Sequence, residues 1–191
     1  ENSNFQKINS SEGKLLKINL NKISSLSNSK ISGDLAAHII TNFQDNKIPS
    51  RIKFGLNVGT KNSSYTLPCN ICFNMRMGNP LLENKPGSFH WAPLFYKRNT
   101  VITLGNFSTL KNYEKVANVE LNFYRSEDSS HITEKIILPP NSEKRFSISD
   151  FQLNKFLSTY GWVTIKADNP YLHGYYFNMN NTGSISGDHV F

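Results

Sequence analysis

The chain has 191 residues, of which 38% are hydrophobic and 12% aromatic, and this composition supports a packed core and excludes general disorder. The formal net charge is +7. The lysines are scattered without a run of four basic residues, so the charge does not indicate a nucleic-acid site. No apolar run reaches the ~18 residues of a transmembrane helix.

Residues 1–34 differ from the rest of the chain, because they are rich in Asn and Ser and contain no aromatic residue after Phe5. Within them only Leu15–Leu20 alternates enough to predict a strand. We therefore expect an extended N-terminal arm that carries one strand. Residues 34–45 are the best helix candidate, because their apolar residues fall on one face and Asp34 is a suitable N-cap. A strand is the alternative there, since the middle of this segment has β character.

From Arg51 onward apolar and polar residues alternate with the period of half-buried strands. Turn residues such as Asn-Pro, Pro-Gly and Asn-Thr-Gly separate the apolar segments. A short helix is expected at residues 151–160, with Asp150 as its cap. The expected strands cover residues 51–58, 71–75, 89–95, 100–104, 116–124, 132–138, 146–148, 162–165, 172–177 and 185–191.

Such short strands with few helices between them indicate an antiparallel arrangement, because a parallel sheet needs long crossover connections. The sequence therefore predicts an all-β fold for residues 35–191: an antiparallel β-sandwich of the jelly-roll or immunoglobulin-like type, with one or two short helices.

The C-terminal part, residues 116–191, has a characteristic order of strands and turns. The order runs through Val119–Tyr124, an acidic turn, Ile136–Leu138, Pro139-Pro140-Asn141-Ser142, Arg145–Ile148, Gly161–Ile165, Asn169-Pro170 and Gly174–Tyr176. In this order the segment resembles immunoglobulin-like or related β-sandwich accessory modules of exported bacterial proteins. The resemblance implies a secreted or cell-surface location and a role as a spacer, an adhesive unit or a carbohydrate-binding unit.

The two cysteines, Cys69 and Cys72, are three residues apart. On a regular strand such residues point to opposite faces. A disulfide would therefore need a turn or a bulge, which Pro68 and Asn70 could help to form. Two thiols without a bridge are the other interpretation. A zinc site would need four ligands, and the chain has no second cysteine pair.

The densest aromatic segment surrounds His90 and Trp91. A tryptophan on an exposed strand or loop can stack on a sugar ring, and Tyr96 or Tyr65 could extend such a platform. The opposing interpretation is that Phe89, Trp91 and Phe95 are core residues at alternating positions, because large aromatic side chains mostly serve cores.

The end of the chain holds His173, Asp188 and His189, which are residue types that bind transition metals. Adjacent residues of one strand point to opposite faces, so the ligands converge only if the strand bends near Gly187. The alternative is three unrelated polar side chains. The middle residue of Gly183–Gly187 is Ile185, so this segment is not a serine nucleophile elbow.

The leading functional hypothesis is a non-enzymatic structural or assembly module of an exported or surface protein, which associates with copies of itself or with surface proteins. In this hypothesis the arm adds a strand to a neighbouring sheet. The second hypothesis is a carbohydrate-binding module that uses exposed aromatic residues. The third is a metal-dependent enzyme. No cofactor is expected.

Overall fold

The structure is a computed structural model that describes residues 55–58, 69–72, 80–96, 99–108, 110–151, 153–157, 159–180 and 184–191. The predicted arm at residues 1–34, its strand Leu15–Leu20, the helix predicted at 34–45 and Tyr65 lie outside these residues. The described elements are β1 (Gly55–Val58), β2 (Cys69–Cys72), η4 (Pro80–Leu82), β3 (Ser88–Phe95), β4 (Thr100–Asn106), β5 (Ala117–Arg125), β6 (His131–Leu138), β7 (Ser142–Ser147), α2 (Leu153–Phe156), β8 (Tyr160–Ala167), β9 (Leu172–Met179) and β10 (Ile185–His189).

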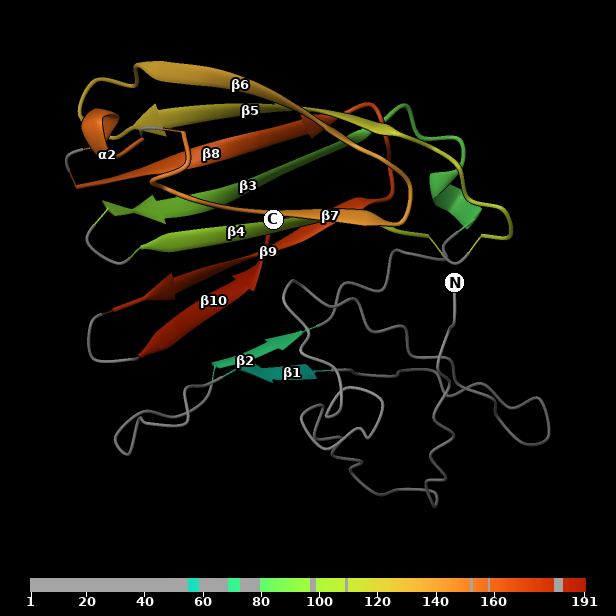
Figure 1. Cartoon of the computed structure of the whole chain (residues 1–191), viewed down its shortest axis with the longest axis horizontal. Coiled ribbons are helices and arrows are strands. Elements are labelled where there is room, and N and C mark those ends of the chain that lie inside the picture. Colours follow the sequence, from blue (N-terminus) through green and yellow to red (C-terminus); the bar gives the residue numbers. More distant parts are fainter. Residues whose placement is uncertain are drawn as a thin grey trace. The chain divides into compact units, whose positions relative to one another are not determined.

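Two four-stranded antiparallel sheets form the described body (Figure 1). We call them the β8 sheet, with the order β3-β8-β5-β6, and the β9 sheet, with the order β10-β9-β4-β7. A separate antiparallel pair consists of β1 and β2. The all-β prediction is confirmed, because the described helical segments are one 3-10 turn and one α-helical turn. None of the described helices has the length and apolarity to cross a membrane.

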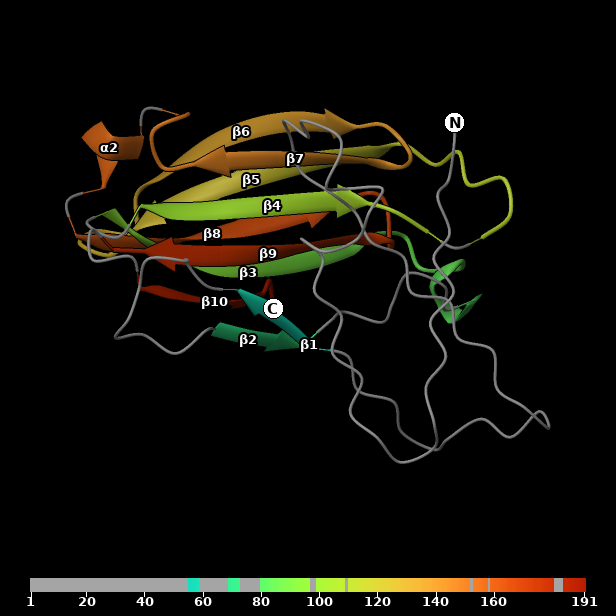
Figure 2. The same cartoon turned by 60° about the horizontal axis from the view of Figure 1, so that its bottom comes forward.

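Five of the seven connections between β3 and β10 pass from one sheet to the other. Only β5–β6 and β9–β10 are hairpins within a sheet. The chain therefore links the two sheets covalently five times. In Figure 2 the strands of both sheets run in nearly the same direction, as in the aligned packing of two sheets.

One core fills the space between the sheets. On β5 the inward residues Ala117, Val119, Leu121 and Phe123 are all at most 2% exposed, and the residues between them are partly or fully exposed. Phe123 meets Phe146 of the β9 sheet edge-on, with 6.3 Å between ring centroids. The alternation that predicted the strands is thus the alternation between this core and solvent.

The segment after β7 differs from its prediction. Helix α2 is a single turn, Leu153–Phe156, whereas residues 151–160 were expected to be helical. Asp150 does not cap it, because Asp150 Oδ2 accepts a hydrogen bond from the Ser147 backbone N–H at 2.6 Å. The carboxylate closes the turn after β7 instead, a common alternative use of Asp near a helix start.

A buried amide network ties the strand ends together. Asn106 and Asn169 have no measurable exposure. Asn106 Nδ2 donates to the carbonyl oxygens of Lys115, Leu138 and Pro139 at 2.8–3.0 Å. Its Oδ1 accepts from Asn169 Nδ2 at 3.1 Å and from the Tyr113 hydroxyl. The network satisfies backbone carbonyl groups just before β5 and at the end of β6, which would otherwise lack partners.

The same network holds Tyr113. Asn169 Nδ2 donates to the Tyr113 hydroxyl at 2.8 Å. Burial raises the pKa of Tyr113 above its usual value, and the hydrogen bond from Asn169 acts in the opposite direction. Tyr113 therefore stays neutral and keeps its proton for Asn106.

Replacing Asn169 should show how much this network stabilises the fold. We expect Asn169→Ala to lower the free energy of unfolding by about 3 kcal/mol, because buried partners lose their hydrogen bonds. Thr133→Ala is the control, since this residue is exposed and its hydroxyl group donates to Asn122 Oδ1 at the surface; it should change stability by at most about 0.5 kcal/mol. Chemical denaturation measures both, and equal effects would contradict the role of the network.

Candidate binding surface

On β3, buried and exposed residues alternate in a way that leaves the aromatic residues Phe89 and Trp91 exposed to solvent. Phe89 is 63% exposed and Trp91 43% exposed, whereas His90 between them is 2% exposed. Phe89 and Trp91 are therefore not core residues, which overturns that interpretation of the aromatic segment. His90 Nε2 lies 3.1 Å from the Leu172 carbonyl oxygen. His90 and Trp91 consequently face opposite sides of the sheet and do not belong to one site.

Strand pairing arranges the outer face of the β8 sheet in three rows that cross all four strands. The first row is Phe89, Lys166, Glu120 and Lys135; the second is Trp91, Thr164, Asn122 and Thr133; the third is Pro93, Trp162, Tyr124 and His131. Directly opposite residues of neighbouring strands are close enough for their side chains to touch. The rows therefore define a continuous surface, which we call the outer face.

The third row is a stack of rings. Trp162 and Tyr124 are nearly parallel, with 5.3 Å between centroids and 8° between planes. Tyr124 and His131 follow at 5.0 Å and 33°. Stacked rings cover each other's faces, so Trp162 and Tyr124 present mainly ring edges to solvent. This row is poorly suited to a flat sugar platform.

The first row carries charges of alternating sign. Glu120 lies opposite both Lys166 and Lys135, and its Oε1 accepts a hydrogen bond from Asn122 Nδ2 at 3.2 Å. A groove of about 760 Å³ runs over this row.

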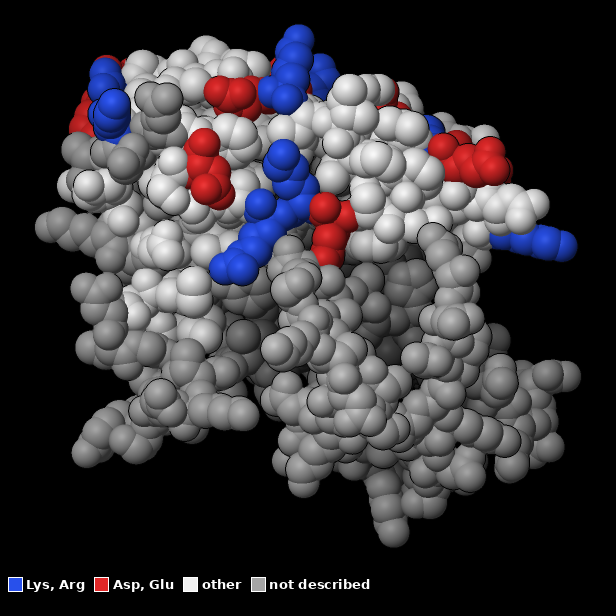
Figure 3. Space-filling view, viewed as in Figure 1, with Lys and Arg blue, Asp and Glu red and all other residues white. Residues whose placement is uncertain are grey.

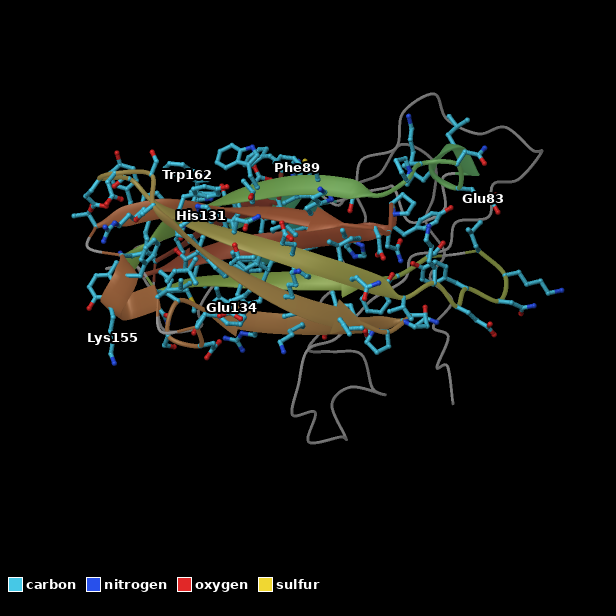
Figure 4. The ribbon with its side chains drawn as sticks, turned by 90° about the horizontal axis from the view of Figure 1, so that it is seen from above. Glu83, Phe89, His131, Glu134, Lys155 and Trp162 are labelled. Carbon is cyan, nitrogen blue, oxygen red and sulfur yellow. The ribbon has the colours of Figure 1, made fainter. Side chains whose placement is uncertain are left out.

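The groove is lined on β6 by Ile137, which is 67% exposed, and on β3 by Phe89. In Figure 4, Phe89 and Trp162 occupy the upper part of the view, with Glu134 and Lys155 below them.

Asp168 also lines the groove. Its carboxylate accepts hydrogen bonds from Asn118 Nδ2 at 2.7 Å and from the Asn118 backbone N–H at 2.9 Å. These bonds to Asn118 hold the pKa of Asp168 below its usual value. Asp168 is therefore ionised at neutral pH and fixed in position.

Phe191 covers part of the β3 edge. Its backbone N–H donates to the Trp91 carbonyl oxygen at 3.0 Å, and the Trp91 N–H donates to the Phe191 carbonyl oxygen at 2.9 Å. The two rings stack with 5.1 Å between centroids. Since β10 belongs to the β9 sheet, this pairing links the two sheets at their β3 and β10 edges. We call it the Phe191 latch.

The candidate metal ligands are only partly brought together. His189 Nδ1 lies 2.8 Å from Asp188 Oδ1, and both side chains are partly exposed. His173 Nδ1 contacts the Tyr171 carbonyl oxygen at 3.2 Å. Within the described part of the chain no three His, Cys, Asp or Glu side chains come close enough to hold a metal ion.

Both cysteines are free thiols in the structure. Cys69 and Cys72 stand at the two ends of the regular strand β2, where a three-residue separation turns them to opposite faces. Cys69 Sγ donates to the Gly187 carbonyl oxygen at 3.3 Å, which places β2 against β10. Of the two interpretations of Cys69 and Cys72, the structure therefore has the one without a bridge.

The remaining aromatic candidate, Tyr96, is 42% exposed. It follows β3 directly, and its backbone N–H donates to the Thr159 carbonyl oxygen at 3.1 Å. Sequence patterns did not single out a further set as surface residues: Phe89, Trp162, Tyr124, Glu120, Lys166, Ile137 and Phe191. The alternating polar residues of β5 and β8 were the available signal, but their alignment into rows depends on strand pairing.

Charges on the body are mixed. Residues 80–191 contain eleven Lys and Arg and ten Asp and Glu, so most of the net charge of +7 belongs to the first 79 residues. Figure 3 shows acidic and basic side chains interspersed on the face in view. The body therefore has no single-sign field that would attract a nucleic acid.

Comparisons with known proteins give little further information. No family model matches the chain, and no curated protein matches it. The crystal structure of Thermotoga maritima 1070 is similar over 56% of this chain and 88% of its own, with 10% sequence identity and a TM-score of 0.40. Similarity at this level carries no argument about fold or function.

Removing the ring of Phe191 should loosen the latch. We expect Phe191→Ala to lower the free energy of unfolding by about 1 kcal/mol, the scale of one aromatic pair. In a Trp162→Phe background Trp91 is the single tryptophan. There, Phe191→Ala should make the Trp91 indole ring more accessible, so that acrylamide quenches its fluorescence more strongly. Leu81→Ala is the control, because Leu81 is 76% exposed on η4. Unchanged quenching after Phe191→Ala would contradict the latch.

Proposed function

We propose that the protein is a non-enzymatic assembly module that associates with a second copy of itself through the outer face of the β8 sheet. The supporting observation is the concentration of exposed apolar residues on this face: Phe89, Trp91 and Ile137, beside the partly exposed Trp162 and Tyr124. Aromatic side chains are enriched in protein interfaces, which also contain polar and charged residues.

The rows support a second copy as the partner, because a row read from β3 to β6 can pack against the same row of the other copy read from β6 to β3. A two-fold axis parallel to the strands places β3 over β6 and β8 over β5 of the other copy. Lys166 of one copy then faces Glu120 of the other, and Glu120 faces Lys166. In the third row Trp162 faces Tyr124 in the same reciprocal way. The first row thus brings opposite charges together, and the third row brings aromatic rings together.

The described edges favour association through the face over association through a strand edge. The Phe191 latch occupies backbone groups of Trp91 on the β3 edge. On β6 the inward side chain of Glu134 is a charge of the kind that hinders edge pairing. Strand addition by the N-terminal arm stays a prediction, since residues 1–34 lie outside the described residues.

Charge reversal tests the reciprocal contact. We expect Glu120→Lys to weaken self-association, because the introduced ammonium group would then face Lys166 of the other copy. The double change Glu120→Lys with Lys166→Glu should restore it by exchanging the two charges. Sedimentation velocity over a concentration series measures the mass. Glu114→Lys is the control, since Glu114 is exposed in the β4–β5 connection and belongs to none of the three rows.

Two outcomes would contradict the proposed interface. One is a wild-type protein that remains monomeric at high micromolar concentration. The other is an oligomer whose mass does not respond to Glu120→Lys, which would place the contact elsewhere.

A carbohydrate-binding module is the second candidate, because Phe89 and Trp91 are exposed aromatic residues next to a groove. If a glycan binds there, Trp91→Ala should reduce its affinity about tenfold or more, because aromatic stacking would be lost. Leu81→Ala should leave the affinity unchanged. A glycan array followed by calorimetry on any ligand found measures this, and binding that survives Trp91→Ala contradicts the aromatic site.

For the fold type we propose a jelly roll, on the basis of the connections. In an immunoglobulin domain with the sheets ABED and CFG, three connections pass between sheets. Here five do, in a body of two four-stranded sheets, and double-sheet jelly rolls have eight strands. A secreted or cell-surface location stays a prediction, and fractionation of the source cells with an antibody against the chain tests it.

A further inference from the structure

Glu134 interrupts the apolar pattern of β6. The inward positions of this strand are Ile132, Glu134, Ile136 and Leu138, and Glu134 lies directly opposite Leu121, which has no measurable exposure. Within the part of the chain that the structure describes, no hydrogen bond or ion pair reaches the Glu134 carboxylate. A polar residue at a core-facing position without a partner often marks a functional site.

A pocket of about 520 Å³ opens beside this carboxylate. It is lined by Ile132, Glu134, Asp150, Phe151, Lys155 and Phe156, and we call it the α2 pocket. Figure 4 shows Glu134 and Lys155 toward the same end of the molecule. The pocket is on the inner side of β6, so it is separate from the outer face.

The apolar walls of the α2 pocket are fixed by their neighbours. The Phe151 ring packs against Phe123 and Phe146, each with 5.4 Å between centroids. The Arg125 guanidinium lies 5.3 Å from the centroid of the Phe156 ring, and Asp128 holds Arg125 through two hydrogen bonds. A ligand would therefore meet walls that are already in place, which reduces the entropy cost of binding.

The charges indicate the class of ligand. Glu134 is half-buried and Lys155 is exposed, so solvent screens the lysine more than the carboxylate. Asp150 adds a second carboxylate, one oxygen of which is held by Ser147. We propose that the α2 pocket binds an alkylammonium or guanidinium group, with the cation at Glu134 and the apolar stem along Phe151 and Phe156. A lysine or arginine side chain of a protein and a small organic amine share this chemistry.

Titration of the full chain by two-dimensional amide NMR tests the proposal. The probes are hexylammonium for a free amine and Nα-acetyl-lysinamide for a protein side chain, with hexanol and hexanoate as the neutral and anionic controls. We expect amide shifts at residues 132–134 and 150–156 for the cations and weaker or no shifts for the controls. The cationic probe that binds more tightly indicates whether the ligand is a free amine or a side chain of a protein.

Two variants distinguish charge recognition from apolar adsorption. Glu134→Gln should weaken binding of the cations about tenfold, the scale of one lost charge-assisted hydrogen bond. Glu114→Gln should not change it, because Glu114 is exposed in the β4–β5 connection and does not line the α2 pocket. Equal binding of hexanol, unchanged affinity after Glu134→Gln, or the absence of shifts with every cation would overturn the proposal. Self-association is measured separately, so either proposal can fail alone.

Discussion

The whole body depends on one constraint: successive strands change sheets, so each must bury one face in the same core. With five crossing connections, a strand that slipped by one residue would expose its apolar side and bury its polar side. The Asn106 and Asn169 network reinforces this at the strand ends, where backbone carbonyl groups would lack partners. Burial of one side of each strand in the core therefore determines which residues form the outer face.

The positions of the strands could be predicted from the sequence, but the phase of β3 could not. Every second residue from Phe89 to Phe95 is large and aromatic or Pro, whereas the alternate residues include the smaller Ala92. Large aromatic residues usually favour the core, yet Ala92 and Leu94 are buried and Trp91 is outside. The room between the two sheets determines which residues of β3 are buried, and the local alternation of residues carries no information about that room.

The candidate sites were harder to predict, because each one combines residues distant in the sequence. The ring stack joins Trp162 to Tyr124 and His131 through the pairing of three strands. Glu134 is different, since its place among Ile132, Ile136 and Leu138 is visible in the sequence as a break in alternation. That break alone predicted no chemistry, because the aromatic walls of the pocket come from Phe151 and Phe156, which are distant in the sequence.

The Phe191 latch has a practical consequence for anyone who attaches a label to this protein. Residues that follow Phe191 in an extended chain would run beside β3, because Phe191 is already paired with the backbone of Trp91. A β-prone extension could pair there as a fifth strand of the β8 sheet, next to Trp91 and the proposed interface. A C-terminal tag is therefore best preceded by proline and glycine, which do not continue a sheet.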